Sequence, residues 1–280
     1  MKPDMKATTL FLSGLLPHEH KTFFKNFTVV LDELNVEWRL LPKTSDIWCR
    51  DYMPVPVNAK KFIQFHFNPD YLLGYEYLWT DPQAVCAMLS FKAIQSDLVV
   101  DGGNIVSLKK KLICTDKIYS ENNKLSELEV RAKLRRCLGV DEVIVIPCEP
   151  FDIIGHADGM LRFIDENTVL VNDYAPFLPA FDLELLAVLM QYDLKVEFLP
   201  YRIFDRVNRD GIPSAKGNYS NFLQIGNVII LPKYGIEEDD AALEKIQELF
   251  PGFIIRTLDC NSIAKEGGVL NCITWVAGRF

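Results

Sequence analysis

The sequence has little positive charge. Thirty Lys and Arg stand against 38 Asp and Glu, so the 280 residues carry a formal net charge of −8 at pH 7. A nucleic-acid-binding surface needs basic residues that neutralise phosphates, so we expect no nucleic-acid partner. No apolar stretch approaches the roughly 20 residues that a membrane helix needs, so we expect no membrane partner. A neutral or cationic small molecule suits this charge better.

Closely spaced metal ligands are also lacking. The seven cysteines include no C-x-x-C pair, and several lie inside apolar runs, where a reduced thiol packs as a small hydrophobe. This usage favours a reducing, cytoplasmic location. With only four histidines, the chain offers no set of closely spaced zinc ligands, so we expect no metal.

A secretory leader is not expected at the start of the chain. The apolar run Thr8 to Leu16 is followed by the polar segment Pro17-His18-Glu19-His20 rather than by a small-residue cleavage site. We therefore expect a strand and a loop there.

A repeated unit runs along the chain. Each copy contains a helical pattern, a short apolar strand, a polar loop and a hairpin, with a period of about fifty to sixty residues. The clearest helix, Glu237 to Phe250, has acidic residues in its first turn and Pro251-Gly252 directly after it. The helix-and-strand pairs are expected at 17–41, 82–100, 125–146, 181–199 and 239–258.

Two-stranded hairpins are expected next to these pairs. In the clearest one, two apolar runs flank Gly226-Asn227, a two-residue turn that tolerates positive φ. The others are expected at 54–67, 105–114 and 160–171.

The five units have no Gly/Ser-rich linker between them. Units that each expose an apolar sheet face are stabilised when they share one core. We therefore predict one domain over residues 1–280, of the α/β class, built as a five-bladed α/β propeller with pseudo-fivefold repeats. The alternative is an ordinary mixed α/β sheet whose apparent period is a coincidence of element lengths.

The reactive residues share one phase of the repeat. They occur in the segments Trp48-Cys49-Arg50-Asp51, Asp101-Gly102-Gly103-Asn104, Gly155-His156-Ala157-Asp158-Gly159, Lys216-Gly217-Asn218-Tyr219-Ser220-Asn221 and Glu266 through Cys272. If the units are related by rotation about one axis, residues at one phase converge at one end of that axis. Small-molecule sites usually lie at such clusters of loops.

The chemistry of this set suits a cation. It combines a thiol, an imidazole and three carboxylates with almost no neighbouring lysine. Asp51 and Asp158 can each accept paired N–H bonds from a planar guanidinium, a match that an ammonium cannot offer. The bound cation favours Cys272 as thiolate. We therefore expect a small cationic guanidinium substrate, with Trp48 either as a cation–π wall or as a core residue.

Each of these residues also has a structural interpretation. Cys272 can be a packed strand residue, and His156 can cap a loop or form half of a metal site with Asp158. Asp51 can be part of a surface ion pair, and Asp101 part of a tight turn.

Six ordered segments resemble those of the agmatine deiminases and the bacterial peptidylarginine deiminases, within the guanidine-modifying or pentein superfamily. The matching segments are Trp48-x-Arg50-Asp51 (W-x-R-D), Asp101-Gly-Gly (E-G-G), Gly155-His156-x-Asp158 (G-H-x-D), Asn218-Tyr219-Ser220-Asn221-Phe222 (S-Y-x-N-F), Pro232-Lys233-Tyr234-Gly235 (P-x-[FY]-G) and Gly267 to Thr274 (G-G-x-[IL]-x-C-I-T). The resemblance covers residues 46–275. It implies a five-bladed propeller, no cofactor and a covalent mechanism.

The resemblance also implies roles for single residues. It makes Cys272 the nucleophile and His156 the general acid and base. Asp51 and Asp158 become the guanidinium clamp, and Asp101 the counterpart of the family's glutamate. Asn218, Glu266 and Gly268 are also expected at the substrate, whereas Cys49 is expected to pack.

The chain departs from the family's pattern at three positions. Asp101 is one methylene shorter than the usual Glu, and Met53 stands where Gly is usual. Glu266 also replaces a common Gly, and it can either receive a second substrate cation or be a loop charge.

The expected reaction converts agmatine to N-carbamoylputrescine and ammonia through a covalent S-alkylthiouronium intermediate. Because no leader is expected, a small amine is favoured over a peptide substrate. The alternatives are a peptidyl-arginine or methylarginine deiminase, an amidinotransferase, and a non-catalytic guanidinium-binding protein. The sequence does not decide the oligomeric state and leaves a homodimer open.

Overall fold

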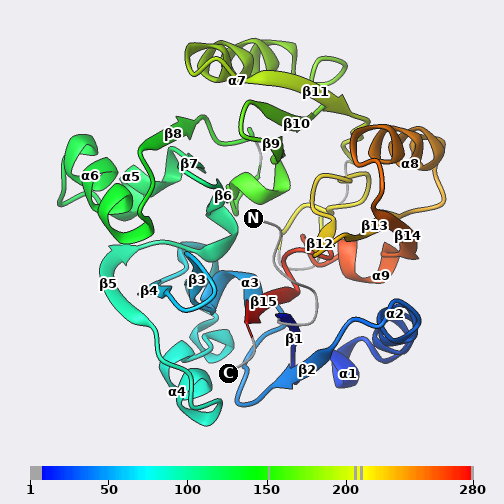
Figure 1. Ribbon diagram of the computed structural model, residues 1–280, viewed down its shortest axis with the longest axis horizontal. Coiled ribbons are helices and arrows are strands. Elements are labelled where there is room, and N and C mark those ends of the chain that lie inside the picture. The colour runs from blue at the N-terminus through cyan, green and yellow to red at the C-terminus, as the bar shows by residue number, and fades with distance from the viewer. Residues whose placement is uncertain (1–7, 151, 205–206, 209–210, 279–280) are drawn as a thin grey trace.

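Five three-stranded sheets surround one axis, with helices at the outer rim (Figure 1). The computed structural model describes residues 8–150, 152–204, 207–208 and 211–278. In every sheet the inner strand pairs antiparallel with a middle strand, which pairs parallel with an outer strand. The predicted five-bladed α/β propeller is therefore confirmed.

Each sheet extends from an inner strand at the axis to an outer strand near the rim. In that order, the strands of the five sheets are β15 Thr274–Gly278, β1 Thr8–Ser13 and β2 Trp38–Leu41; β3 Val55–Pro56, β4 Phe62–His66 and β5 Ile94–Val99; β6 Val106–Leu108, β7 Lys111–Thr115 and β8 Glu142–Ile146; β9 Leu161–Asp165, β10 Thr168–Asn172 and β11 Lys195–Leu199; β12 Leu223–Ile225, β13 Val228–Lys233 and β14 Ile254–Asp259.

Helices connect the middle and outer strands, and short turns precede the inner strands. The connecting helices are α1 Leu16–Glu19, α2 Lys21–Glu33, α4 Pro82–Met88, α5 Lys117–Glu121, α6 Glu127–Leu138, α7 Pro179–Gln191 and α8 Glu238–Leu249, with the 3₁₀ turns η2 Asp70–Leu72 and η3 Glu76–Leu78. The short turns before inner strands include α3 Cys49–Tyr52, η4 Gly102–Asn104, η5 Ala157–Gly159 and α9 Asn261–Ala264.

A parallel pair of strands needs a crossover, and helices supply it in this fold. Helix α6 begins at a capping box, in which Ser126 and Glu129 bond to each other's backbone N–H groups, and it ends at Gly139 with φ 70°. Helix α2 buries Phe23, Phe27 and Leu31 on one face. Burying each such side chain contributes about 1.5–3 kcal/mol, which fixes the helix against its sheet.

All four predicted hairpins and all five helix-and-strand pairs are present. The N-terminal strand is also confirmed, although part of the expected loop after it forms the helical turn α1, with Pro17 in its first turn. A fifth hairpin-like pair joins β15 to β1, with Leu10 opposite Val276. The indole of Trp275 packs on Phe11 and donates a 2.8 Å hydrogen bond to the Pro54 carbonyl, so this pair closes the ring.

None of the helices within the described ranges is both long enough and apolar enough to cross a lipid bilayer.

Candidate active site

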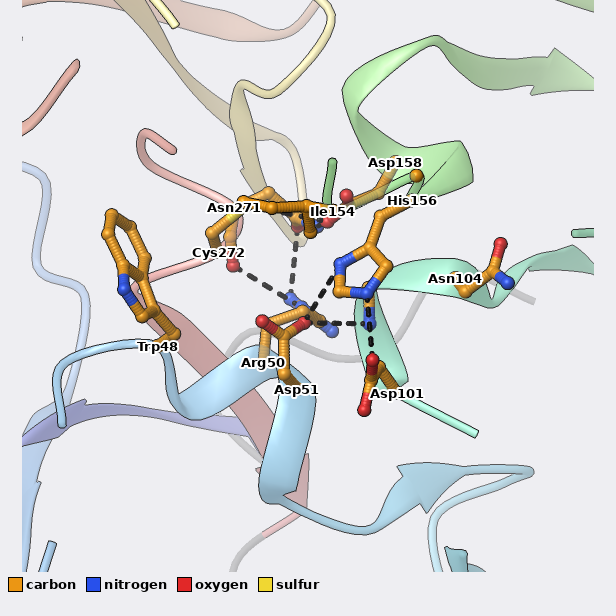
Figure 2. A network of polar contacts seen from close by, with 12 residues as sticks. Trp48, Arg50, Asp51, Asp101, Asn104, Ile154, His156, Asp158, Asn271 and Cys272 are labelled. Atoms are coloured by element: carbon orange, nitrogen blue, oxygen red, sulfur yellow. Dashed lines mark hydrogen bonds and ion pairs between the residues drawn. The ribbon is translucent and has the colours of Figure 1, made fainter. Parts of the chain in front are cut away.

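The predicted site residues lie just before the inner strands. Asp51 lies on α3 before β3, Asp101 precedes β6, His156 and Asp158 precede β9, and Cys272 precedes β15. Because these strands surround one axis, their N-terminal ends meet at one end of the propeller. Figure 2 shows these side chains pointing toward one another from different sheets.

Two carboxylates flank the ring of His156 (Figure 2). Nε2 lies 3.0 Å from Asp101 Oδ2, and Nδ1 lies 3.4 Å from Asp51 Oδ1. Asp51 also accepts a 3.1 Å bond from the Gly103 N–H and a 3.3 Å bond from the Tyr71 hydroxyl. Asp51 is buried, so the alternative of a surface ion pair is wrong.

Asp101 reaches His156 although it is one methylene shorter than the family's glutamate. It lies behind the imidazole and is not part of the cavity wall, so its contact with a ligand is through His156. Met53, the second departure, is buried in the core at 2% exposure and is not part of the described wall of this cavity.

Lys117 forms an ion pair with Asp101. Its Nζ lies 3.6 Å from Asp101 Oδ2, 2.8 Å from Asp70 Oδ1 and 3.5 Å from Glu121 Oε1, and it donates a 2.8 Å bond to the Ile154 carbonyl. The sequence shows almost no lysine near the reactive segments, but the fold brings this one into the network. Lys117 lies on α5, away from every motif, so the sequence did not indicate that it belongs to the site.

The ionisation of the His156 pair is strongly perturbed. Burial, together with the charges of Asp101 and Asp158, raises the pKa of Asp51 to about 7, although His156 opposes the shift. Burial on its own lowers the pKa of His156, but Asp51 and Asp101 outweigh it and raise that pKa to about 9. At neutral pH the imidazole is therefore protonated.

Asp158 forms the opposite side of the site. Its Oδ2 accepts a 2.5 Å bond from Asn271 Nδ2, and Asn271 Oδ1 accepts a 3.0 Å bond from Arg50 Nη2. The other oxygen, Oδ1, is buried without a hydrogen-bond partner among the described residues. A buried carboxylate oxygen left in this way can accept a bond from a bound cation.

Cys272 lies in a turn rather than in a strand, so the packed-strand alternative is wrong. Its Sγ donates to Asn221 Oδ1 at 3.3 Å and lies 3.9 Å from Asp158 Oδ2. Burial raises the pKa of the thiol well above its usual range, and the charges of Asp158 and Asp51 raise it further. The resting thiol is therefore protonated.

Asn221 and Asn271 were not predicted as site residues. Both lie inside segments that resemble the family, next to residues that were singled out, and this proximity was the available signal. Asn221 bonds to Cys272 and to the Asp158 backbone carbonyl, so it links the two sides of the site.

Two glycines allow the close approach of these groups. A Cβ at Gly103 would lie 2.6 Å from both Asp51 Oδ1 and His156 Nδ1. A Cβ at Gly268 would lie 2.7 Å from Trp48 Cζ3. Side chains at these positions would displace the clamp or the indole.

A cavity of about 530 Å³ lies over this constellation. This volume is within the range of small-molecule sites. Its wall includes the predicted residues Trp48, Asp51, His156, Asp158, Asn218, Glu266, Gly268 and Cys272, and it also includes the unpredicted residues Glu149, Asp152 and Asn221. The side chain of Asn218 is engaged with the Gly159 carbonyl at 2.7 Å, so it shapes the wall.

Two further sequence expectations concern Cys49 and the metal ligands. Cys49 is fully buried in a core cluster, as predicted. In the described parts of the chain, no three His, Cys, Asp or Glu side chains form a group that could hold a metal ion.

Comparisons with known proteins agree with this geometry. A model of the Porphyromonas-type peptidyl-arginine deiminase family matches residues 19–277. A Mycoplasma capricolum protein with the name "Putative agmatine deiminase" is 25% identical over 320 residues, covering 98% of this chain and 87% of its own length.

Solved structures share the fold. Agmatine deiminase of Enterococcus faecalis has a TM-score of 0.78 at 19% identity, covering 98% of this chain and 93% of the other. Dimethylarginine dimethylaminohydrolase of Pseudomonas aeruginosa has a TM-score of 0.59 at 14% identity, covering 98% and 99%. The family match spans nearly the whole described chain. The chain therefore belongs to the Porphyromonas-type peptidyl-arginine deiminase family and is a guanidine-modifying deiminase, a hydrolase that acts on C–N bonds.

Proposed function

We propose that the chain hydrolyses the guanidinium group of agmatine, with Cys272 as the nucleophile. The observation that carries this proposal is the convergence on one cavity of a thiol, a protonated imidazole and two buried carboxylates from three different sheets. The unpartnered oxygen of Asp158 further supports a cationic ligand.

In the first half of the reaction the substrate guanidinium lies between Asp51 and Asp158. Its charge lowers the cost of ionising Cys272, whose proton passes to water. The thiolate attacks the guanidinium carbon and forms a C–S bond. His156 then gives its proton to one terminal nitrogen, the C–N bond breaks, and ammonia leaves. An S-alkylthiouronium cation remains on Cys272, with His156 neutral.

In the second half water attacks the same carbon. Neutral His156 takes a proton from this water, and a C–O bond forms. The C–S bond then breaks, and the hydroxyl proton returns to the sulfur as the ureido C=O forms. Cys272 and protonated His156 are restored, and the proton first released is the one that converts ammonia to ammonium.

The cavity wall favours agmatine over free arginine. Three carboxylates beyond the clamp, those of Glu149, Asp152 and Glu266, line it, and none of its described residues is Lys or Arg. An ammonium at the distal end of the substrate is attracted by such a wall, whereas an α-carboxylate is repelled.

Of these three carboxylates, we propose Glu149 as the one that binds the distal ammonium. It accepts a 2.6 Å bond from the Tyr201 hydroxyl and a 2.7 Å bond from the Tyr174 hydroxyl, so its orientation is fixed. Burial, together with the charge of Asp152, raises its pKa to about 7, although the hydrogen bonds from the two tyrosines oppose the shift. A cationic amine nearby stabilises the ionised form.

A substrate panel tests the proposal. Agmatine, free arginine and an arginine-containing peptide are incubated with the protein, and ammonia and the ureido product are identified by mass. We expect turnover of agmatine with a kcat/KM at least about 100-fold above that of arginine, which corresponds to about 2.7 kcal/mol of charge discrimination. No turnover of any of the three, or a preference for the peptide, contradicts the proposed substrate.

Replacing Glu149 with glutamine tests the distal carboxylate. We expect Glu149→Gln to raise the KM for agmatine about tenfold, which corresponds to about 1.4 kcal/mol, with kcat little changed. Butylguanidine, which lacks the amine, should show no such change. Glu244→Gln on the exposed face of α8 is the matched control. An equal effect on agmatine and butylguanidine rules out an ammonium site at Glu149.

A further inference from the structure

A second cavity, of about 370 Å³, lies on the propeller axis below the active site. Residues from the inner strand of every sheet line it, among them Val55, Ser107, Arg162, Gln224 and Val276. It extends from Asn271, next to the nucleophile, to the hairpin turn at Gly226. Hairpin turns follow four of the inner strands, so the cavity reaches the end of the axis opposite to the catalytic cysteine.

Two arginines face this cavity, and no Asp or Glu is among its described lining residues. Arg162 and Gln224 each lie between buried neighbours on β9 and β12, and strand alternation turns them toward the axis. The nearby hairpin-turn charges, Lys109 and Glu166, pair with each other. Within the described part of the chain, neither Arg162 nor Arg50 has a carboxylate within ion-pair distance.

Each guanidinium is only partly satisfied by the protein. Arg162 Nε donates to the Ser220 carbonyl at 3.0 Å and Nη2 to the Phe222 carbonyl at 2.6 Å. Arg50 Nε donates to the Asn271 carbonyl at 3.3 Å and Nη2 to its side-chain oxygen at 3.0 Å. Both arginines therefore keep Nη1 as a donor without a partner among the described residues.

The guanidinium of Arg162 lies over the ring of Phe222, 5.2 Å from its centroid, but its charge has no close counter-ion among the described residues. Burial, together with the neighbouring charge of Arg50, lowers its pKa to about 10, although Asp158 opposes the shift. Arg162 and Arg50 are both half-buried. A half-buried cation beside another cation, without a close counter-ion, is unfavourable, and an anion between them removes part of that cost.

We propose that this axial cavity binds a small oxyanion, through Arg50 and Arg162. Guanidinium groups match oxyanions such as phosphate, because their planar N–H groups can donate in pairs. Ser107 and Gln224 add neutral donors at the wall. The site is separate from the substrate cavity, whose carboxylates repel an anion.

The alternative is that both arginines only join neighbouring segments of backbone and that water fills the cavity. Binding of inorganic phosphate distinguishes an oxyanion site from a water-filled cavity. Its binding to the intact, substrate-free protein is measured by calorimetry and by the shift in Tm, at constant ionic strength with chloride as the balancing anion. We expect saturable binding of phosphate and a rise in Tm that chloride does not reproduce.

Gln224→Glu places a carboxylate in the cavity from an exposed position and should weaken phosphate binding at least about tenfold. Gln247→Glu, an exposed position on the outer helix α8, makes the same charge change elsewhere and should bind as the unmodified protein does. Arg162→Gln should abolish phosphate binding. If that variant does not fold, Gln224→Glu still tests the site. Equal effects of phosphate and chloride, or equal binding by the two Gln→Glu variants, overturn the proposal. Because no substrate is present, the result is independent of whether agmatine is turned over.

Discussion

Replacing Cys272 with alanine is expected to reduce kcat for agmatine by at least about 10⁴-fold, because the described cavity wall contains no other thiol that could form the covalent intermediate. The side chain is half-buried in a turn, and its partners Asn221 and Asp158 retain other bonds within the site. We therefore expect the fold and the affinity for guanidinium to survive. Calorimetric binding of agmatine to the variant measures this directly.

The matched control for this variant is Cys137→Ala. Cys137 is also a half-buried free thiol, but it lies on helix α6 at the outer rim. We expect this variant to keep activity within about twofold, because surface substitutions away from special features change little. Full activity in Cys272→Ala, or equal losses in both variants, contradicts the role of Cys272.

Replacing His156 with glutamine is expected to lower kcat by about 10²–10⁴-fold, the usual contribution of a positioned acid and base. Glutamine can still bond to Asp51 or Asp101, but it cannot transfer a proton. His66→Gln, at an exposed position on β4, is the control and should leave kcat unchanged.

The pH profile separates proton transfer from a structural role of His156. In the unmodified enzyme kcat/KM should fall as pH decreases through about 7, because Asp51 gains a proton and no longer attracts the guanidinium. It should also fall as pH rises through about 9, because His156 loses the proton that it donates to the departing nitrogen. The two pKa values that the profile reports are apparent values, because Asp51 and His156 titrate as a coupled pair. The His156→Gln variant should lack the upper limb, and a variant that keeps it excludes His156 as the acid.

Local sequence patterns predicted most of the fold. The Gly226-Asn227 turn and the helix from Glu237 to Phe250 were visible because turn chemistry and helical periodicity act over a few residues. The pairing of β15 with β1 was not predicted. Its partners lie at opposite ends of the chain, and no local pattern specifies which strand closes a ring.

The sequence predicted the reactive side chains of the site, but it did not predict the residues that hold them in place. Cys272, His156, Asp51 and Asp158 stood out because their chemistry recurs at one phase of the repeat. Lys117 and Asn271 did not, since their importance comes from distances of 3.6 Å to Asp101 and 2.5 Å to Asp158 that only the folded chain creates. Whether Asp101 reaches its partner was likewise decided by packing rather than by side-chain length.

The covalent intermediate is the central claim, and the mass of the enzyme during turnover tests it most directly. Enzyme mixed with agmatine is quenched in acid within the first turnovers, digested, and analysed by mass spectrometry. We predict that the peptide containing Cys272 gains the mass of agmatine less that of ammonia, and that the Cys272→Ala peptide gains nothing. Product formation without this adduct in the unmodified enzyme, or with the adduct on another cysteine, would contradict the account.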